Sequence, residues 1–596
     1  MRAILVTLNV IVLSSLLALA QTWPPALFAF LAIGPLSALS LWSVSKGGVS
    51  VRAIFVTTAC AVTTGLICGA YFEPAALYGF LFVGPLILLG TVDMLQTKRA
   101  IRRNFPVIGH ARYLMEEIRP EIQQYFIESN TEGRPFTRED RSLVYQRSKG
   151  ELDSLPFGTQ RDVYKPGYEW LTHSMSPATP RDMNPRVTIG EGRCKQPYSA
   201  SILNVSAMSF GALSGKAIEA LNRGALEGGF AHNTGEGSIS PHHLHGGDLI
   251  WQIGTGYFGC RDEHGAFDED KFAERASLDQ VKMIEIKISQ GAKPGHGGIL
   301  PAAKITEEIA EIRGVPLGRD VISPPAHSAF STPIGLLEFV TKLRELSGGK
   351  PVGFKLCVGK PREFFAVCKA MLETGMVPDF ICVDGGEGGT GAAPFEFSNS
   401  LGSPAIDGLT FVHNALVGIG LRDQIKIIAS GRVVSGLSLN RFLALGADVC
   451  YSARSMMMSM GCIQARKCNN NDCPVGIATQ NPSLTAGLVV AEKSHRVARY
   501  HLETVHAAVE LAAAAGLEAP SELKPWHIMR RVSELETLHY GDLIGFIESG
   551  ALLRDELPEK FVRSWESATA TSFKHAEEVA GGDAGASASQ AVSTPA

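Results

Sequence analysis

The sequence predicts an α/β protein: a (β/α)8 TIM barrel that follows four transmembrane helices and carries a helical C-terminal extension. Two observations lead to this fold class. Four apolar runs fill the first hundred residues, at 3–20, 23–44, 53–72 and 74–95, and each is about as long as a helix that crosses a hydrocarbon core. From residue 198 onward, short β-branched runs alternate with helical patterns, which is typical of strand and helix units around a parallel sheet.

The first hundred residues contain a tandem repeat. RAILVT at 2–7 matches RAIFVT at 52–57, and GPL at 34–36 matches GPL at 84–86. Lysine and arginine residues stand at the ends of the runs that would share one side of a bilayer, which predicts that side to be cytoplasmic. We therefore expect residues 1–97 to form a multi-pass anchor of two tandem hairpins in the inner (cytoplasmic) membrane, with the rest of the chain in the cytoplasm.

Other interpretations of the N-terminal runs are weaker. A cleaved signal peptide is the alternative for the first run, because Arg2 supplies a positive start and the ALA sequence at 18–20 resembles a cleavage site. An anchor is favoured over a transporter, since Asp93 is the single charged residue in the four runs and stands near an end. The net charge of -4, with acidic and basic residues mixed after residue 100, argues against a nucleic-acid-binding surface.

Eight β-branched runs predict the barrel strands, whose carboxyl ends carry the active site in barrels of this kind. They are expected at 202–210, 229–236, 283–289, 320–326, 351–359, 379–386, 425–432 and 447–454. A doubly wound open sheet is the alternative, but no G-x-G-x-x-G turn follows the first run. The remaining divisions are expected to be a connector at 98–196, the barrel at 197–461, a cysteine loop at 462–485, a helical extension at 486–576 and a disordered tail at 577–596.

Lysine residues stand at the ends of two predicted strands. Lys287, Gln290 and Lys293 lie at and after the third strand, and two lysines with an amide suit a planar, anionic ligand. Lys355 lies inside an apolar run, where a lysine is costly unless it meets a negative partner. A reduced flavin would be such a partner, and a structural ion pair is the alternative.

Glycine-rich segments follow the sixth and seventh strands. Their glycines allow a ligand to approach the backbone closely, although each segment could also be a simple tight turn. Barrels commonly bind a phosphate after strands seven and eight, at backbone N–H groups near a helix start. The predicted ligand contacts in this region are Glu387, Gly388, Gly389, Ser430, Gly431, Arg432 and Arg454.

Three cysteines, Cys462, Cys468 and Cys473, follow the eighth strand in a polar segment that ends in Cys-Pro. A structural disulfide is disfavoured in a reducing compartment. Three thiolates suit an iron–sulfur cluster with three irons, whereas zinc wants a fourth ligand that no nearby Cys or His supplies. An iron–sulfur cluster is therefore favoured, and zinc stays as the alternative.

Several motifs together resemble the FMN-binding synthase domain of glutamate synthase, over roughly residues 197–485. They are CIQARKCNNNDCPVGIATQNP, MSFGALS, HNTGEG, KISQGAKPGHGG and EGGTGA. The resemblance implies a barrel that binds FMN and 2-oxoglutarate, with a 3Fe-4S cluster held by Cys462, Cys468 and Cys473. It further implies the reduction of 2-iminoglutarate, formed from 2-oxoglutarate and ammonia, to glutamate.

The resemblance also implies roles for individual residues. The implied catalytic residues are Glu236, Gln290 and Lys293. The implied substrate contacts are Ser209, Gln290, Lys293 and Arg313, of which the arginine would hold a carboxylate through a bidentate pair. The implied FMN contacts are Met208, Ser209, Lys287, Lys355 and the glycine-rich segments, with Ser430, Gly431 and Arg432 at the phosphate.

The sequence departs from the family in several places. It shows neither the N-terminal glutaminase cysteine nor the large repetitive domain, so ammonia is expected to be free or to come from a separate glutaminase subunit. Ser238 and His296 differ from the residues usual in two substrate loops, which leaves the amino acceptor open. No nucleotide-binding fingerprint is present, so electrons are expected from a partner such as ferredoxin, a reductase subunit or a membrane carrier.

Three functions remain in competition. The first is glutamate synthesis, and the second is a related imine reduction with another amine or oxo-acid, such as N-substituted glutamate synthesis. The third is a membrane-anchored flavin electron-transfer subunit that binds no oxo-acid. A simple relay needs no carboxylate pocket, so the third is disfavoured by Lys287, Gln290, Lys293 and Arg313.

Overall fold

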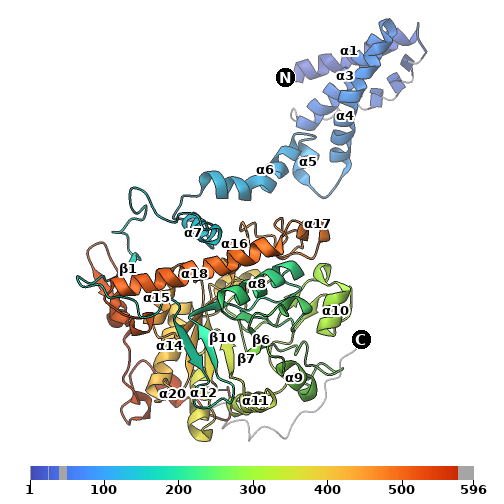
Figure 1. The fold of residues 1–596 in the computed structure, drawn as a ribbon. Coiled ribbons are helices and arrows are strands. Elements are labelled where there is room, and N and C mark those ends of the chain that lie inside the picture. Colours follow the sequence, from blue (N-terminus) through green and yellow to red (C-terminus); the bar gives the residue numbers. More distant parts are fainter. Residues whose placement is uncertain are drawn as a thin grey trace. The chain divides into compact units, whose positions relative to one another are not determined.

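The computed structural model describes the ranges 2–24, 26–27, 29–31, 33–35, 37–38 and 50–574. The chain divides into two compact units, Met1–Glu128 and Ser129–Ala596 (Figure 1). The tail expected at 577–596 lies outside the described residues, and so does much of the apolar run at 23–44.

The first unit is built of helices. They are α1 (Arg2–Ala20), α3 (Val51–Phe72), the 3-10 helix η1 (Pro74–Gly79), α4 (Phe80–Leu95), α5 (Ala100–Asn104), α6 (Gly109–Ile122) and the π-helix η2 (Gln123–Ile127). In the described residues two segments are long and apolar enough to cross a membrane, Val51–Phe72 and Pro74–Leu95, and Ile4–Ala20 is a shorter apolar helix. The expected number of four is not confirmed, because Ile4–Ala20 is shorter than the two spanning segments and part of the run at 23–44 lies outside the described residues.

Two polar contacts join helices of the first unit. Asn9 Nδ2 in α1 donates to Thr57 Oγ1 in α3 at 2.8 Å, and both side chains are buried. Asp93 lies 2.8 Å from His110 Nε2 and accepts from the backbone N–H of Val107 at 3.0 Å. The charged residue near the end of the fourth apolar run therefore fastens the end of α4 to the start of α6.

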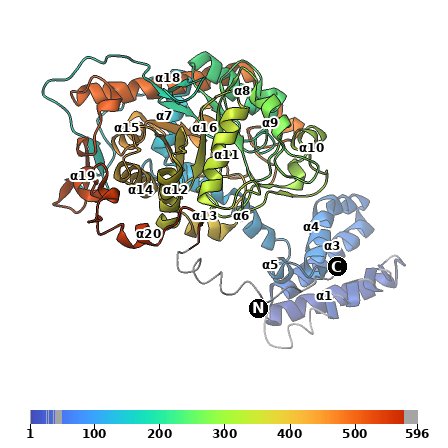
Figure 2. The same cartoon turned by 90° about the horizontal axis from the view of Figure 1, so that it is seen from below.

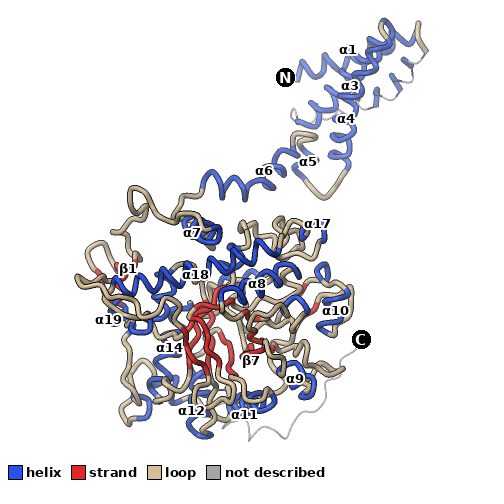
Figure 3. Tube along the Cα trace, in the orientation of Figure 1, coloured by secondary structure: helices blue, strands red, loops and turns tan. Residues whose placement is uncertain are grey.

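A closed barrel of eight parallel strands forms the centre of the second unit, as predicted. Its strands are β4 (Leu203–Val205), β5 (His232–Asn233), β6 (Leu249–Ile253), β7 (Val281–Lys287), β10 (Val352–Leu356), β11 (Phe380–Asp384), β12 (Lys426–Ser430) and β13 (Val449–Ser452). β13 pairs with β4 and closes the barrel, with Tyr451 opposite Asn204. Figure 3 shows the strands in red among the blue helices.

One predicted barrel strand is wrong. The run at 320–326 contains β9 (Val321–Ile322), which pairs antiparallel with β8 (Ile299–Leu300) outside the barrel. Two prolines follow β9, and proline cannot donate to a ladder. The strand that takes its place is β6, which follows β5 after only a 3-10 turn, η3 (Pro241–His243), so no intervening α-helix marks it. The strand that ends at Lys287 is thus the fourth rather than the third.

Helices surround the barrel (Figure 2). They are α8 (Gly215–Gly228), α9 (Glu269–Ala276), α10 (Glu307–Arg313), α11 (Pro333–Leu346), α12 (Pro361–Thr374), α13 (Phe395–Ser400), α14 (Ala405–Gly418), α15 (Gly436–Ala444) and α16 (Arg454–Ser459), with the 3-10 turn η4 (Ala302–Lys304). α8 illustrates their construction: Ser214 Oγ caps its start by accepting from the Ala217 N–H at 3.2 Å, and Gly229, with a φ of 66°, ends it.

The segments that precede and follow the barrel in the sequence pack against it. The helices among them are α7 (Arg138–Lys149), α17 (Pro482–Thr485), α18 (Val490–Ala514), η5 (Pro520–Glu522), η6 (Pro525–His527), α19 (Tyr540–Ile544), η7 (Ala551–Leu553) and α20 (Val562–Glu566). The strands are β1 (Glu169–Leu171), β2 (Arg186–Ile189), β3 (Tyr198–Ser201), β14 (Ile528–Arg531) and β15 (Thr537–His539). β1 pairs with β14, so the connector and the C-terminal extension share a small sheet, and the extension is not purely helical. α18 packs against α7, α8 and α15.

Candidate active site

A cavity of about 530 Å³ lies at the carboxyl ends of the barrel strands. Loops that follow the strands form one part of its wall, and the cysteine loop forms another. Arg313 and Glu387 are the two sequence-predicted residues that do not line it. The predicted residues that do are Met208, Ser209, Glu236, Lys287, Gln290, Lys293, Lys355, Gly388, Gly389, Ser430, Gly431, Arg432, Arg454, Cys462, Cys468 and Cys473.

An ion pair stands at the centre of the cavity wall. Lys287 is the last residue of β7, and its Nζ lies 2.8 Å from Glu236 Oε1, in the loop after β5. Burial alone would raise the pKa of the Glu236 carboxyl, but Lys287 and the other nearby cations hold it below its usual value. A Cβ at Gly254 or Gly298 would overlap the Glu236 side chain, so glycine is needed at both positions. The two side chains are therefore tightly held against each other.

Lys293 is the second cation of the cavity and has no carboxylate in direct contact among the described residues. Its side chain is 2% exposed, and its Nζ donates to the Ala392 carbonyl at 2.9 Å. Burial, assisted by the positive charge of Lys287, lowers the pKa of Lys293 to about 8. A buried ammonium with one carbonyl partner is suited to bind an anion that enters the cavity.

Arg313 braces the loop that contains Ser209 rather than facing the cavity. Its guanidinium donates to the Phe210 carbonyl at 2.7 Å and to Ser209 Oγ at 3.3 Å. It also lies over the Phe258 ring, 5.2 Å from the centroid, and its Nε has no partner among the described residues. The predicted contact with a substrate carboxylate would require this side chain to leave these partners.

Lys355 meets the negative partner that its burial requires. Its Nζ lies 3.5 Å from Asp384 Oδ2, and the same oxygen accepts from the Gly291 N–H at 2.8 Å. Burial would lower the pKa of Lys355, but Asp384 and its other acidic neighbours hold it above the usual value. The alternative of a structural ion pair is thus realised, while the side chain still lines the cavity. Asp384 ties the loop after β7 to the end of β11.

The predicted phosphate end contains two arginines and an unpredicted aromatic ring. Arg432 and Arg454 both lie over the Phe136 ring, at 5.3 Å and 4.7 Å from its centroid. Burial, with the neighbouring Arg432, lowers the pKa of Arg454 to about 10. Glu387 does not reach the cavity: its Oε2 accepts from the Ala405 N–H at 3.0 Å and so caps α14. Its main contribution is to fix the glycine-rich loop.

The three cysteines of the loop after α16 face the same cavity and are free thiols. Burial, together with Cys468 and Cys473, raises the pKa of Cys462 to about 12. No group of three His, Cys, Asp or Glu side chains in the described part of the chain is placed to hold a single metal ion. Among the described residues that line the cavity, no His and no fourth Cys accompanies the three thiols.

Sequence reasoning missed several residues of the cavity wall. Gln252 lies in the unrecognised strand β6, and its Nε2 donates to the buried Glu285 at 2.6 Å. Lys304 and Phe136 belong to segments with no recognised motif. Ser238 and His296, the two departures from the family pattern, do not line the cavity.

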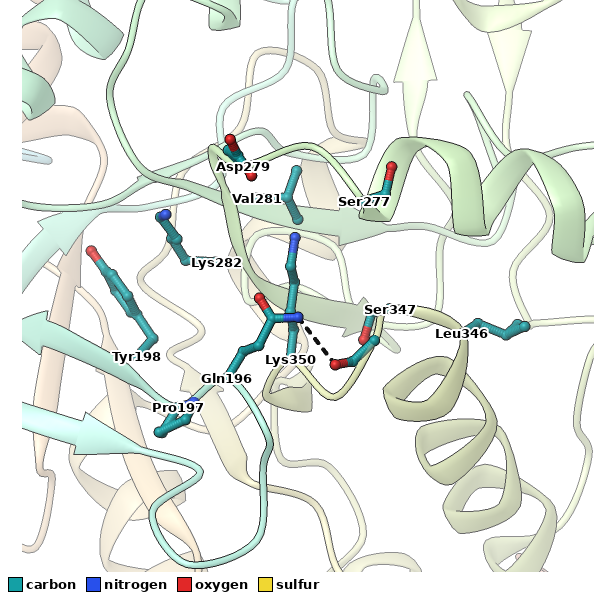
Figure 4. A pocket seen from close by; sticks show the side chains of 11 residues that line it. Gln196, Pro197, Tyr198, Ser277, Asp279, Val281, Lys282, Leu346, Ser347 and Lys350 are labelled. Carbon is teal, nitrogen blue, oxygen red and sulfur yellow. Dashed lines mark hydrogen bonds between the residues drawn. The ribbon is translucent and has the colours of Figure 1, made fainter.

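A second cavity, of about 490 Å³, lies at the other end of the barrel, where β7 and β10 begin. Figure 4 shows its polar lining. Lys350 Nζ donates to the carbonyls of Ala276 and Leu278, at 2.6 Å and 3.0 Å, and Gln196 donates to the Gly348 carbonyl at 3.1 Å. Lys350 and Gln196 are thus engaged with the backbone, and Tyr198 donates to Asp248 at 2.9 Å. None of the predicted site residues lines this cavity.

The chain was compared with known proteins. Residues 179–518 match the family described as the conserved region in glutamate synthase. The chain is 38% identical over 494 residues to the glutamate synthase large subunit-like protein YerD of Bacillus subtilis, covering 76% of this chain and 94% of that protein. It is 35% identical over 325 residues to the NADPH archaeal glutamate synthase of Methanocaldococcus jannaschii, covering 54% of this chain and 60% of that protein. A mutant flavocytochrome b2 with pyruvate bound matches at 13% identity and a TM-score of 0.37, over 70% of this chain and 84% of its own.

The family match extends over more than half of the chain and includes the whole barrel, the cysteine loop and all of the cavity lining except Pro135 and Phe136. The relative in Bacillus subtilis is matched over nearly its full length. This chain therefore belongs to the glutamate synthase family and is an oxidoreductase of the glutamate synthase type.

Proposed function

We propose that this protein uses FMN and a 3Fe-4S cluster to reduce 2-iminoglutarate, formed from 2-oxoglutarate and ammonia, to glutamate. The observation that carries the proposal is the set of buried cations that shares one cavity with three free thiols. Lys293 and the Lys287–Glu236 pair lie on one wall, and the cysteine loop lies on another. An oxo-acid with two carboxylates is the kind of ligand that such a wall attracts.

The residues that would hold FMN are those at the carboxyl ends of the later strands. Lys355 would supply a positive charge to the flavin, and Arg432 and Arg454 would bind the phosphate together with N–H groups near the start of α15. When bound, FMN supplies two-electron reduction chemistry, and the cluster supplies single electrons to it. The three cysteines would hold the cluster as thiolates.

Side chains of this protein would bind the substrate, orient it and hold a proton near it. Lys293 holds a proton at Nζ at neutral pH and presents its charge to a substrate carboxylate or carbonyl oxygen. Glu236 fixes the ammonium of Lys287 at the cavity wall. Arg313 acts through Ser209, whose hydroxyl accepts from it and is thereby oriented. Charge that develops on the substrate is stabilised because these groups are already in place.

The affinity for 2-oxoglutarate is expected to fall as the pH rises through 8. Lys293, with a pKa of about 8, is an ammonium below that pH and neutral above it, so the charge that attracts the anion is lost on the alkaline side. The dissociation constant should increase about tenfold per pH unit above that point. It can be measured by titrating the flavin absorbance with 2-oxoglutarate, without ammonium. The Lys293→Arg variant, whose side chain keeps its charge, should lack this dependence; an equal dependence in both proteins would contradict the assignment.

Product formation tests the proposed reaction. The chemically reduced protein is incubated without oxygen with 2-oxoglutarate and 15N-ammonium, and amino acids are identified by mass spectrometry. The proposal expects 15N-glutamate. Methylamine in place of ammonium tests the related imine reduction, and N-methylglutamate in the absence of labelled glutamate would replace the lead function by that alternative. No product with either amine would favour a flavin electron-transfer subunit.

We further propose that the N-terminal unit anchors the protein in the cytoplasmic membrane, with the catalytic unit in the cytoplasm. Two apolar segments are long enough to span, and their large side chains are exposed, as Leu81 and Phe82 are at 71% and 80%. The protein should therefore stay in the membrane pellet after a carbonate wash and be released by detergent. Release by carbonate alone would show that it is peripheral or soluble.

The nitrogen and electron sources are proposed to be separate proteins or small molecules. Two relatives carry different donors in their names, NADPH in one and ferredoxin in the other. For this chain we propose an electron-donor protein such as a ferredoxin or a reductase subunit. Ammonia would be free or delivered by a separate glutaminase subunit.

A further inference from the structure

Lys304 is a buried cation that the account above does not use. It ends the turn η4, its side chain is 2% exposed, and its Nζ donates to the carbonyls of Ala212 and Ala478 at 3.0 Å and 2.8 Å. Within the ranges that the structure describes, no carboxylate forms an ion pair with it. Two carbonyl dipoles do not neutralise a full charge, and a buried ammonium is costly unless a negative group lies nearby.

The negative group would be the one that the cysteine loop holds. Lys304 lines the same cavity as Cys468 and Cys473, and its Nζ donates to the carbonyl of Ala478 in the segment that follows Cys473. The loop is also fastened to the turn that carries Lys304, because Asn471 Nδ2 donates to the Ala303 carbonyl at 3.1 Å. Hydrogen bonds to the surrounding backbone therefore hold the buried side chain of Lys304 against the cysteine loop.

The same lysine joins the cysteine loop to the substrate side of the cavity. One of its acceptors, Ala212, belongs to the segment that contains Ser209, and the other, Ala478, follows the last cysteine. Ser214 Oγ donates to the Gly476 carbonyl at 2.8 Å and Gln480 Nε2 donates to the Leu213 carbonyl at 2.8 Å, which reinforces this junction. Lys304 lies where three segments meet.

We propose that Lys304 is the counter-charge of the group held by Cys462, Cys468 and Cys473 and a positioning residue that raises its reduction potential. This inference rests on the proposed cluster. An electron added to the cluster makes it more negative, so a fixed ammonium stabilises the reduced state more than the oxidised state. Because the site is buried, solvent and salt screen this interaction weakly.

The test compares cluster potentials in detergent-solubilised, cofactor-loaded protein by redox titration followed by electron paramagnetic resonance. Lys304→Met should make one-electron reduction of the cluster roughly tenfold or more less favourable, which corresponds to a potential about 59 mV more negative. Lys304→Arg keeps the charge and should keep the wild-type potential. Lys467→Met, which removes an exposed lysine beside Cys468, is the matched control and should shift the potential much less.

Each outcome decides the proposal. Equal potentials in wild-type, Lys304→Met and Lys304→Arg proteins would overturn it, and so would equal shifts in Lys304→Met and Lys467→Met. If the Lys304→Met protein loses its iron, the cluster potential is measured in Lys304→Gln instead. Loss of iron from Lys304→Arg as well would show that the lysine acts in folding alone, which would overturn the assignment of its charge. Absence of iron and of a cluster signal in the wild-type protein would instead show that the proposed cofactor is wrong.

Discussion

Replacing Lys293 by alanine is expected to slow the oxidation of the reduced protein by 2-oxoglutarate and ammonium by about 10²- to 10³-fold, the usual effect of removing one preorganised charge or donor from a reacting centre. The side chain is buried, faces the cavity and has one carbonyl partner, so no neighbouring group takes over its role. The rate should be measured by stopped-flow absorbance of the flavin without oxygen.

Two controls separate chemistry from damage. Lys360→Ala removes an exposed lysine that pairs with Glu363 on the barrel surface, and it should leave the rate unchanged. The flavin content and thermal midpoint of Lys293→Ala should equal those of the wild-type protein, because this lysine makes no buried ion pair. A normal rate in Lys293→Ala would remove the oxo-acid pocket from the account and strengthen the interpretation as an electron relay.

Replacing Lys355 by methionine is expected to yield protein without bound flavin and with reduced stability. The change leaves Asp384 buried without its partner, and breaking a buried pair in this way costs about 3–5 kcal/mol. It also removes a positive charge from the cavity that is proposed to hold the flavin. Flavin content can be read from absorbance after purification, and stability from the thermal midpoint.

A double variant distinguishes the two roles of Lys355. Lys355→Met with Asp384→Asn removes both charges, and asparagine retains an oxygen that accepts from the Gly291 N–H. Stability should recover in the double variant, since replacing both members of a buried pair is far less costly than removing one. Flavin should remain absent if Lys355 acts on it directly. Recovery of flavin together with stability would assign Lys355 to a structural pair only.

The barrel could be predicted because seven of its strands follow the pattern of apolar, β-branched runs between helices. The exception is instructive. β6 has no α-helix before it, so the alternation of strands and helices does not predict it. The apolar run at 320–326 was predicted as the missing strand, but it forms an outer hairpin with β8. The alternation of strands and α-helices identifies strands that are joined by helices, which is the commonest connection in such barrels. It does not identify a strand that is joined to the previous one by a 3-10 turn.

Cavity residues that belong to sequence motifs were predicted. Cavity residues contributed by segments distant in the sequence were not. Lys287, Lys293 and the three cysteines stand in recognisable loops. Lys304 and Phe136 reach the cavity through tertiary contacts that no local pattern reveals. Glu387 illustrates the opposite error, because its place in a glycine-rich loop suggested ligand contact, whereas its carboxylate caps a helix. Charge alone does not tell which way a side chain points.

The central claim is that the flavin in this cavity passes its electrons to an imine of 2-oxoglutarate. The most direct test is to reduce the flavin of the detergent-solubilised protein without oxygen and to record its absorbance after adding 2-oxoglutarate, ammonium or both. The account predicts reoxidation that is rapid only when both are present, with one glutamate formed per flavin oxidised. A flavin that stays reduced with both present would contradict the account and direct attention to another acceptor.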